Sequence, residues 1–275
     1  MSTDAPARTG TPGLAVSQLN VQFGGIKAIS DVTVEVRGSE VHGLVGPNGS
    51  GKTTILNAIC GFVAADGAIH VGETRIDRLP SHRRMATGLG RTFQNPRSSQ
   101  GLTVRDLMRI GEHLRSVQPW WQVALKPRAA DRALGASNQR AVRLLEMLGL
   151  PGRVLDDQVS RLPSGVLKIV DIARAMMGSP RLLLLDEPTS GMNDAEIEIL
   201  HGALQRLRSS DVTIVLVEHN LRFMFDICDS MTVLNMGAVV ARGAPAEVFA
   251  REDVIRAYMG ENQRPLAAES MAKGS

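Results

Sequence analysis

Cysteine, long apolar runs and blocks of like charge are what this 275-residue sequence most lacks. Only Cys60 and Cys228 occur, both in apolar surroundings, which predicts buried, reduced thiols in a cytosolic protein. No apolar run approaches the ~18 residues needed to span a bilayer. The first 13 residues are polar and rich in proline and glycine, unlike a secretory signal. We therefore expect any role at a membrane to act through another chain.

Charge is nearly balanced, with 31 lysine and arginine against 28 aspartate and glutamate residues, for a net charge of +3. No segment resembles a basic arm or an acidic tail, so the charge pattern does not indicate a nucleic-acid binder. The apolar fraction of 43% is ordinary for a soluble protein. The length suffices for one large domain or two small ones.

The periodicity of apolar residues predicts an α/β fold. Val32, Val34 and Val36 alternate as in a half-buried strand, and 41–45 reads as a more uniformly apolar strand. RLLLLDEP (181–188) and DVTIVLVEHN (211–220) read as buried strands of parallel type. A helix over about 197–207 would connect the last two. Residues 231–243 predict a hairpin turned at Asn235–Gly237, and 247–260 a final helix.

We expect one domain over residues 14–260 in which a mostly helical insertion, at about 95–163, interrupts a core of parallel strands. An antiparallel patch of strands is expected on the N-terminal side of this core. Residues 1–13 are expected to be a disordered lead and 261–275 a flexible tail.

A glycine-rich loop between a predicted strand and a predicted helix is the strongest chemical signal. The segment GPNGSGKTT fits the phosphate-loop pattern G-x-x-x-x-G-K-[ST] in the required context. Its glycines let backbone N–H groups approach phosphate oxygens, and the helix N-terminus adds partial positive charge. Lys52 would neutralise the β- and γ-phosphates, and the Thr53 hydroxyl would ligate Mg²⁺. The predicted nucleotide-binding residues of this loop are Gly46, Pro47, Asn48, Gly49, Ser50, Gly51, Lys52, Thr53 and Thr54.

Acidic and basic side chains follow two other predicted strands. Asp186 and Glu187 end the run LLLLDE, and His219 ends TIVLVEH. Because ligands bind at the carboxyl ends of parallel strands, Asp186 is expected to hold Mg²⁺ and Glu187 to act as general base on a water molecule. His219 is expected to contact the γ-phosphate. Gln94, in RTFQNPR, is a candidate to sense both the metal and the water.

A helix is also predicted to begin beside Ser164 and Gly165, directly after Pro163. Apolar residues at Val166, Ile169, Val170, Ala173, Met176 and Met177 keep helical spacing. The N–H groups at the start of such a helix lack partners within it. The sequence thus raises the question of which acceptor this helix end faces.

These motifs, in this order, resemble those of ATP-binding cassette ATPases from about Leu14 to Gly260. GPNGSGKTT, RTFQNPR, LPSGVLKIVDIARA, LLLLDEPTSGMN and VLVEHN match the phosphate loop, Q-loop, signature, carboxylate strand with D-loop, and switch histidine. The resemblance implies a RecA-like P-loop NTPase core. It also implies that Phe23 stacks on adenine, although a core phenylalanine is the alternative.

In that family two cassettes dimerise head to tail around ATP and Mg²⁺. The resemblance therefore implies that Ser164 and Gly165 face a γ-phosphate held by a second cassette, and that Ser190–Asn193 reach across the dimer. The common signature reads Leu-Ser-Gly-Gly-Gln, whereas this chain has Leu162, Pro163, Ser164, Gly165 and Val166. One site of the dimer is therefore a candidate for weakening.

A narrower similarity joins the chain to one ATPase of branched-chain amino-acid importers and their amide or urea relatives. It rests on FGGIKAISDVT, the RTFQNPR region, SGMN, VEHN and the ending VIRAYMGE. This implies permease partners, an indirect link to a solute-binding protein, and a place at the cytoplasmic face of the inner membrane. No nucleic acid is expected.

Several alternatives remain open from the residues alone. The chain could instead be a soluble cassette protein acting on nucleic acid or ribosomes, or a nucleotide-binding subunit with little turnover. Pairing with itself or with a different cassette is equally open. Trp120 and Trp121 either pack within the assembly or touch lipid.

Overall fold

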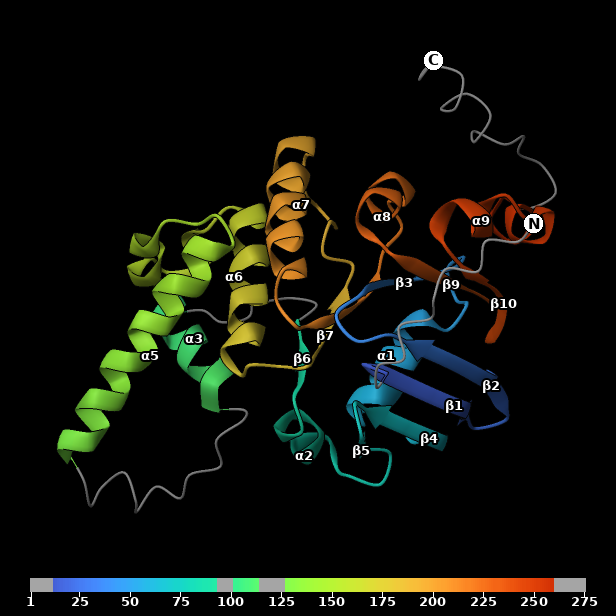
Figure 1. The fold of residues 1–275 in the computed structure, drawn as a ribbon, viewed down its shortest axis with the longest axis horizontal. Coiled ribbons are helices and arrows are strands. Elements are labelled where there is room, and N and C mark those ends of the chain that lie inside the picture. Colours follow the sequence, from blue (N-terminus) through green and yellow to red (C-terminus); the bar gives the residue numbers. More distant parts are fainter. Residues whose placement is uncertain (1–11, 93–100, 114–126, 260–275) are drawn as a thin grey trace, which may run out of the picture.

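The computed structural model describes residues 12–92, 101–113 and 127–259. Gln94, Trp120, Trp121 and most of the predicted lead and tail lie outside these ranges. The described chain forms two sheets, with helices around the larger one (Figure 1). No helix within the described ranges has the length and apolar character that crossing a bilayer requires.

The larger sheet has six strands in the order β10-β9-β3-β8-β7-β6, and all neighbours are parallel except β10 and β9. Its strands are β3 (Val41–Val45), β6 (Leu89–Arg91), β7 (Leu182–Asp186), β8 (Thr213–Val217), β9 (Ser230–Asn235) and β10 (Ala238–Gly243). Every residue of β3, β7 and β8 is buried, as their continuous apolar runs predict. Because these three strands are adjacent and parallel, the segments that follow them meet at one edge.

The smaller sheet is antiparallel, with the order β2-β1-β4-β5. Its strands are β1 (Leu14–Phe23), β2 (Ile26–Val36), β4 (Asp66–Val71) and β5 (Thr74–Arg75). Val32, Val34 and Val36 all point into the core, which confirms the predicted alternation. This sheet and α1 share one apolar core with one face of the larger sheet.

Helices cover the other face of the large sheet and form a lobe at its side (Figure 1). The helices are α1 (Lys52–Cys60), α2 (Ser81–Ala86), α3 (Val104–His113), α5 (Pro127–Met147), α6 (Ser164–Met177), α7 (Asp194–Arg208), α8 (Leu221–Ile227), α9 (Pro245–Phe249) and α10 (Glu252–Met259), with 3₁₀ turns η2 (Gly152–Asp156) and η3 (Val159–Arg161). α7 connects β7 to β8, as predicted. α3, α5 and α6 pack together in the lobe, which agrees with a helical insertion between β6 and β7, and α6 lies beyond the predicted end of that insertion at residue 163.

The prediction of a single final helix over 247–260 is wrong, because the structure has two helices there, α9 and α10. α9 begins earlier, at Pro245, and ends at Phe249. Val248 and Val254 are both buried in the core. Six residues of straight helix would turn these side chains about 120° apart, so the break between the helices lets both face inward.

A buried polar cluster joins the start of β3 to β9. Glu40 accepts hydrogen bonds from Arg37 at 2.7 Å and from Ser230 at 2.9 Å, and His42 bonds Ser230 and Thr232. Burial alone would raise the pKa of Glu40, but the nearby His42 and the hydrogen bonds from Arg37 and Ser230 lower it to about 2. Burial lowers the pKa of His42, so this ring is neutral near pH 7. Glu40 is thus an ionised carboxylate held by donors.

Glu40 therefore makes stability depend on pH in the acid range. A carboxyl whose folded pKa is lowered stabilises the fold above its unfolded value of 4.5, and this contribution is lost as pH falls toward 2. Glu40→Gln is expected to lower the free energy of unfolding by roughly 2 kcal/mol at pH 7 and by much less at pH 2 to 3. Urea unfolding at the two pH values measures this, with the exposed Glu35→Gln as control. An equal loss at both values would contradict it.

Candidate functional site

The phosphate loop follows β3 directly and ends at α1. Gly51 caps α1 with φ of 104°, a left-handed conformation that favours glycine, and a Cβ there would lie 2.5 Å from Ile29 Cδ1. The N–H of Gly237, in the β9–β10 turn, donates to the carbonyl of Ser50 at 3.0 Å. The neighbouring hairpin thus braces the loop in a conformation that the sequence motif predicts.

Lys52 lies inside the loop rather than in solvent. Its Nζ donates to the carbonyl oxygens of Gly46 and Pro47, both at 2.9 Å, and the side chain is buried. Burial lowers the pKa of Lys52, while the nearby carboxylates of Glu187 and Asp186 raise it. An ammonium group held by two neutral carbonyls at a helix N-terminus is placed to exchange them for anionic phosphate oxygens.

Asp186 ends β7 with one carboxylate oxygen paired and the other not. Oδ2 accepts from Arg91 at 3.1 Å, whereas the buried Oδ1 has no hydrogen-bond partner within the described chain. Burial raises the pKa of Asp186, and Arg91 opposes this. A buried anionic oxygen without a donor fits a hard cation such as Mg²⁺. No group of three acidic, histidine or cysteine side chains that could hold a metal ion occurs among the residues the structure describes.

Glu187 and His219 meet above this edge of the sheet. Glu187 Oε1 lies 3.0 Å from His219 Nε2, and both side chains are about two-fifths exposed, at 44% and 42%. Glu187 has φ of 48°, a conformation that bulky residues rarely adopt. Its N–H donates to Val217 at 2.9 Å, and its carbonyl accepts from Lys168 Nζ at 3.3 Å. The structure therefore brings together a solvent-accessible carboxylate and imidazole, as predicted from the strand ends.

Glu218 is a site residue that the sequence reasoning missed. It is buried, and its two oxygens accept from the N–H groups of Thr189 at 2.5 Å and His219 at 2.9 Å. Glu218 thus ties the segment after β7 to the segment after β8. An acidic residue at the end of an otherwise apolar strand was the available signal.

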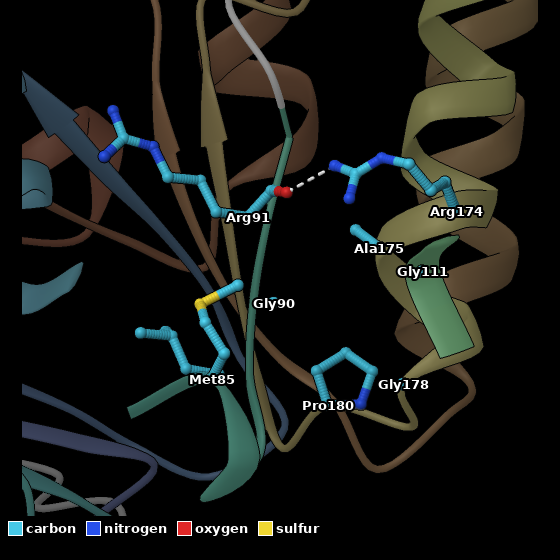
Figure 2. Close-up of a pocket in the computed structure, with 9 residues that line it drawn as sticks. Met85, Gly90, Arg91, Gly111, Arg174, Ala175, Gly178 and Pro180 are labelled. Atoms are coloured by element: carbon cyan, nitrogen blue, oxygen red, sulfur yellow. Dashed lines mark hydrogen bonds between the residues drawn. The ribbon is translucent and has the colours of Figure 1, made fainter. Parts of the chain in front are cut away.

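Arg91 and Arg174 connect the site to the helical lobe. The Arg91 guanidinium bonds Asn57 and Asp186, while its carbonyl accepts from Arg174 Nη2 at 2.7 Å. Figure 2 shows Arg174 reaching from α6 to this carbonyl beside a cavity of about 20 Å³, which has room for one water. Arg174 also bonds the buried Asp171 at 2.6 Å. The strand that leads to Gln94 is therefore tied to α6.

The predicted signature helix begins at Ser164, as α6. Its N-cap is Pro163, whose side chain makes no capping hydrogen bond. The Gly165 N–H donates to Glu196 Oε1, on α7, at 2.9 Å. The acceptor at this helix start is thus a carboxylate of the same chain, which the sequence reasoning did not anticipate. Phe23, at the end of β1, is 51% exposed, which excludes a core phenylalanine.

Comparison with known proteins agrees with this geometry. The family model described as ABC transporter matches residues 29–190. The high-affinity branched-chain amino acid transport ATP-binding protein LivG of Salmonella typhimurium is 36% identical over 252 residues, covering 91% of this chain and 98% of the relative. The corresponding BraF of Pseudomonas aeruginosa is 34% identical over the same coverage.

A solved ATP-binding cassette of an ABC transporter, in its ADP conformation, has the same fold. It superimposes with a TM-score of 0.78 at 27% identity and covers 91% of this chain and 99% of that one. The P-loop NTPase core, the antiparallel sheet and the helical insertion are therefore confirmed. Because the family model spans more than half of the chain and the relatives nine-tenths of it, the chain belongs to the ABC transporter family and is one of its ATP-hydrolysing subunits.

Proposed function

We propose that this chain hydrolyses ATP to power the uptake of branched-chain amino acids through membrane permeases. The observation that carries the proposal is the 3.0 Å contact between Glu187 and His219. Glu187 directly follows Asp186, whose buried Oδ1 has no hydrogen-bond partner in the described chain. This geometry supports hydrolysis rather than binding alone. The substrate class is supported by the names of the relatives, which are branched-chain amino acid transport proteins.

The proposed chemistry uses residues from three strand ends. Gly46–Thr54 bind the phosphates through backbone N–H groups, and Lys52 exchanges its loop carbonyls for phosphate oxygens. Mg²⁺, when bound, would neutralise charge on the β- and γ-phosphates, with Asp186 Oδ1 and Thr53 as ligands. Glu187 accepts a proton from the attacking water, and His219 orients the carboxylate through its 3.0 Å contact.

The remaining roles complete a composite site. Gln94 is proposed to contact the metal and the water, Phe23 to stack on adenine, and Ser164 and Gly165 to face the ATP of a second cassette. We propose residues 14–260 as one cassette, peripheral at the cytoplasmic face of the membrane through its permeases. A solute-binding protein would deliver the amino acid.

The proposal is tested by reconstituting the chain with its permeases and partner cassette in vesicles. Leucine, isoleucine and valine are expected to enter in a process that requires ATP and stops with Glu187→Gln. Lysine and glutamate uptake is the specificity control. If ATP is hydrolysed but no branched-chain amino acid moves, the substrate class is wrong and the ATPase assignment stands.

One observation favours a second function, that of a subunit with little turnover. Pro163 provides no side-chain cap, and Glu196 occupies the Gly165 N–H that would face the second cassette's ATP. Steady-state phosphate release from the assembled transporter distinguishes the two. ATP binding without release would favour the low-turnover function.

A further inference from the structure

The start of α6 depends on a residue outside α6 for its cap. The first N–H groups of a helix need acceptors, and Ser, Thr, Asp or Asn at the N-cap usually supplies one. Pro163 occupies that position here and makes no side-chain hydrogen bond. The Gly165 N–H is instead bound by Glu196 Oε1 at 2.9 Å, across 31 positions of sequence.

Glu196 and Gly165 are packed against each other as well as hydrogen-bonded. A Cβ built on Gly165 would lie 2.8 Å from Glu196 Cγ and 2.9 Å from its Cδ, closer than real side chains approach. The absence of a side chain at Gly165 therefore allows the carboxylate to reach the helix start. The N–H groups of Asn193 and Gly165 lower the pKa of Glu196, so the group is ionised near neutral pH.

The other oxygen of the same carboxylate belongs to a second helix. Glu196 Oε2 accepts from the Asn193 N–H at 3.0 Å, and Asn193 Oδ1 accepts from the Glu196 N–H at 3.0 Å. This reciprocal pair is the capping box of α7. Ser190–Asn193 lead directly into it. One carboxylate thus links the start of α6 to the segment that follows Glu187.

We propose that Glu196 is a positioning residue. In the absence of nucleotide it accepts the hydrogen bond of the Gly165 N–H, and when a second cassette binds ATP the γ-phosphate replaces it as acceptor. Two anions cannot share one N–H without repulsion, so ATP arrival displaces Glu196 Oε1. Because Oε2 holds Asn193, the displacement acts on Ser190–Asn193 and hence on the turn at Glu187. The inference rests on the composite ATP site of the proposed function.

The test measures association of the full chain as ATP is titrated, with Glu187→Gln present in every variant to prevent hydrolysis. Sedimentation velocity, on the chain alone or with its partner cassette, gives the ATP concentration at which association is half complete. Glu196→Gln removes the charge and keeps one oxygen acceptor, which can serve Gly165 or Asn193 but not both. It is expected to lower the half-saturating ATP concentration roughly fivefold. The difference should shrink at 1 M salt, where the screening length falls to about 3 Å.

Asp194→Asn is the matched control, because Asp194 lies in the same first turn of α7 without a hydrogen bond to α6 among those described. It should leave the half-saturating concentration within about twofold of the parent. Glu196→Ala removes both charge and acceptor, so its melting temperature should fall while its ATP requirement also falls. If Glu196 only capped α6 and did not compete with the γ-phosphate, Glu196→Ala would instead raise the ATP requirement.

An unchanged ATP requirement in Glu196→Gln, an equal shift in Asp194→Asn, or a raised requirement in Glu196→Ala would each overturn the inference. Failure of the parent protein to associate with ATP at all, even with its partner cassette, would instead overturn the composite site of the proposed function. The inference would fall with it. The parent titration therefore separates the two failures.

Discussion

Replacing Glu187 by glutamine is expected to lower kcat for ATP hydrolysis by roughly 10³- to 10⁴-fold while ATP binding persists. The amide has nearly the shape of the carboxylate, and its oxygen can keep the contact with His219 Nε2, which is 3.0 Å long in the unmodified chain. An amide cannot accept a proton from water at neutral pH. The variant should therefore accumulate as an ATP-bound dimer.

Steady-state phosphate release measures kcat, and size-exclusion chromatography with ATP detects the dimer. Glu198→Gln is the matched control, because Glu198 is an exposed carboxylate on α7. It should hydrolyse ATP at the rate of the unmodified chain. Turnover of Glu187→Gln within about tenfold of that rate would show that another group is the base.

Removing the ammonium group of Lys52 is expected to weaken ATP binding by about 10²- to 10³-fold. Nζ donates two 2.9 Å hydrogen bonds inside the loop, so a bound nucleotide would gain two charge-assisted bonds in their place. Lys52→Ala loses both bonds and leaves the phosphates without their buried counter-charge. Calorimetric titration with ATP measures the effect directly.

The fold of Lys52→Ala is checked by its circular dichroism spectrum and melting temperature. Lys273→Ala makes the same change of charge near the end of the chain and should bind ATP normally. If Lys52→Ala folds and binds ATP within about threefold of the unmodified chain, the nucleotide site has been placed on the wrong loop.

Much of the core site was predictable because its motifs encode local backbone geometry. The loop over 46–54 carries its own glycines and leads into the N-terminus of α1, so the motif predicts its phosphate-binding shape, although Gly237 of the distant hairpin braces it. The buried strands β3, β7 and β8 were predictable because their sequences are mostly apolar. Once these strands were taken as parallel, Asp186, Glu187 and His219 had to lie at one edge.

Contacts between residues far apart in sequence were not predictable. Arg91 pairs with Asp186 across 95 positions, and Arg174 reaches the Arg91 carbonyl across 83. β6 has only three residues, too few for a periodic pattern, so its pairing with β7 left no signal. The break between α9 and α10 likewise depends on where the core lies relative to Val248 and Val254.

The amino-acid order by itself indicated the family, the phosphate loop and the positions of Asp186, Glu187 and His219, because these depend on short motifs and strand ends. Only the tertiary structure decided which acceptor meets the start of α6. Pro163 removed the local cap, and packing of α7 against α6 placed Glu196 on Gly165 in its stead. An orphaned N–H must find a partner somewhere, and which one it finds depends on the arrangement of the helices in space.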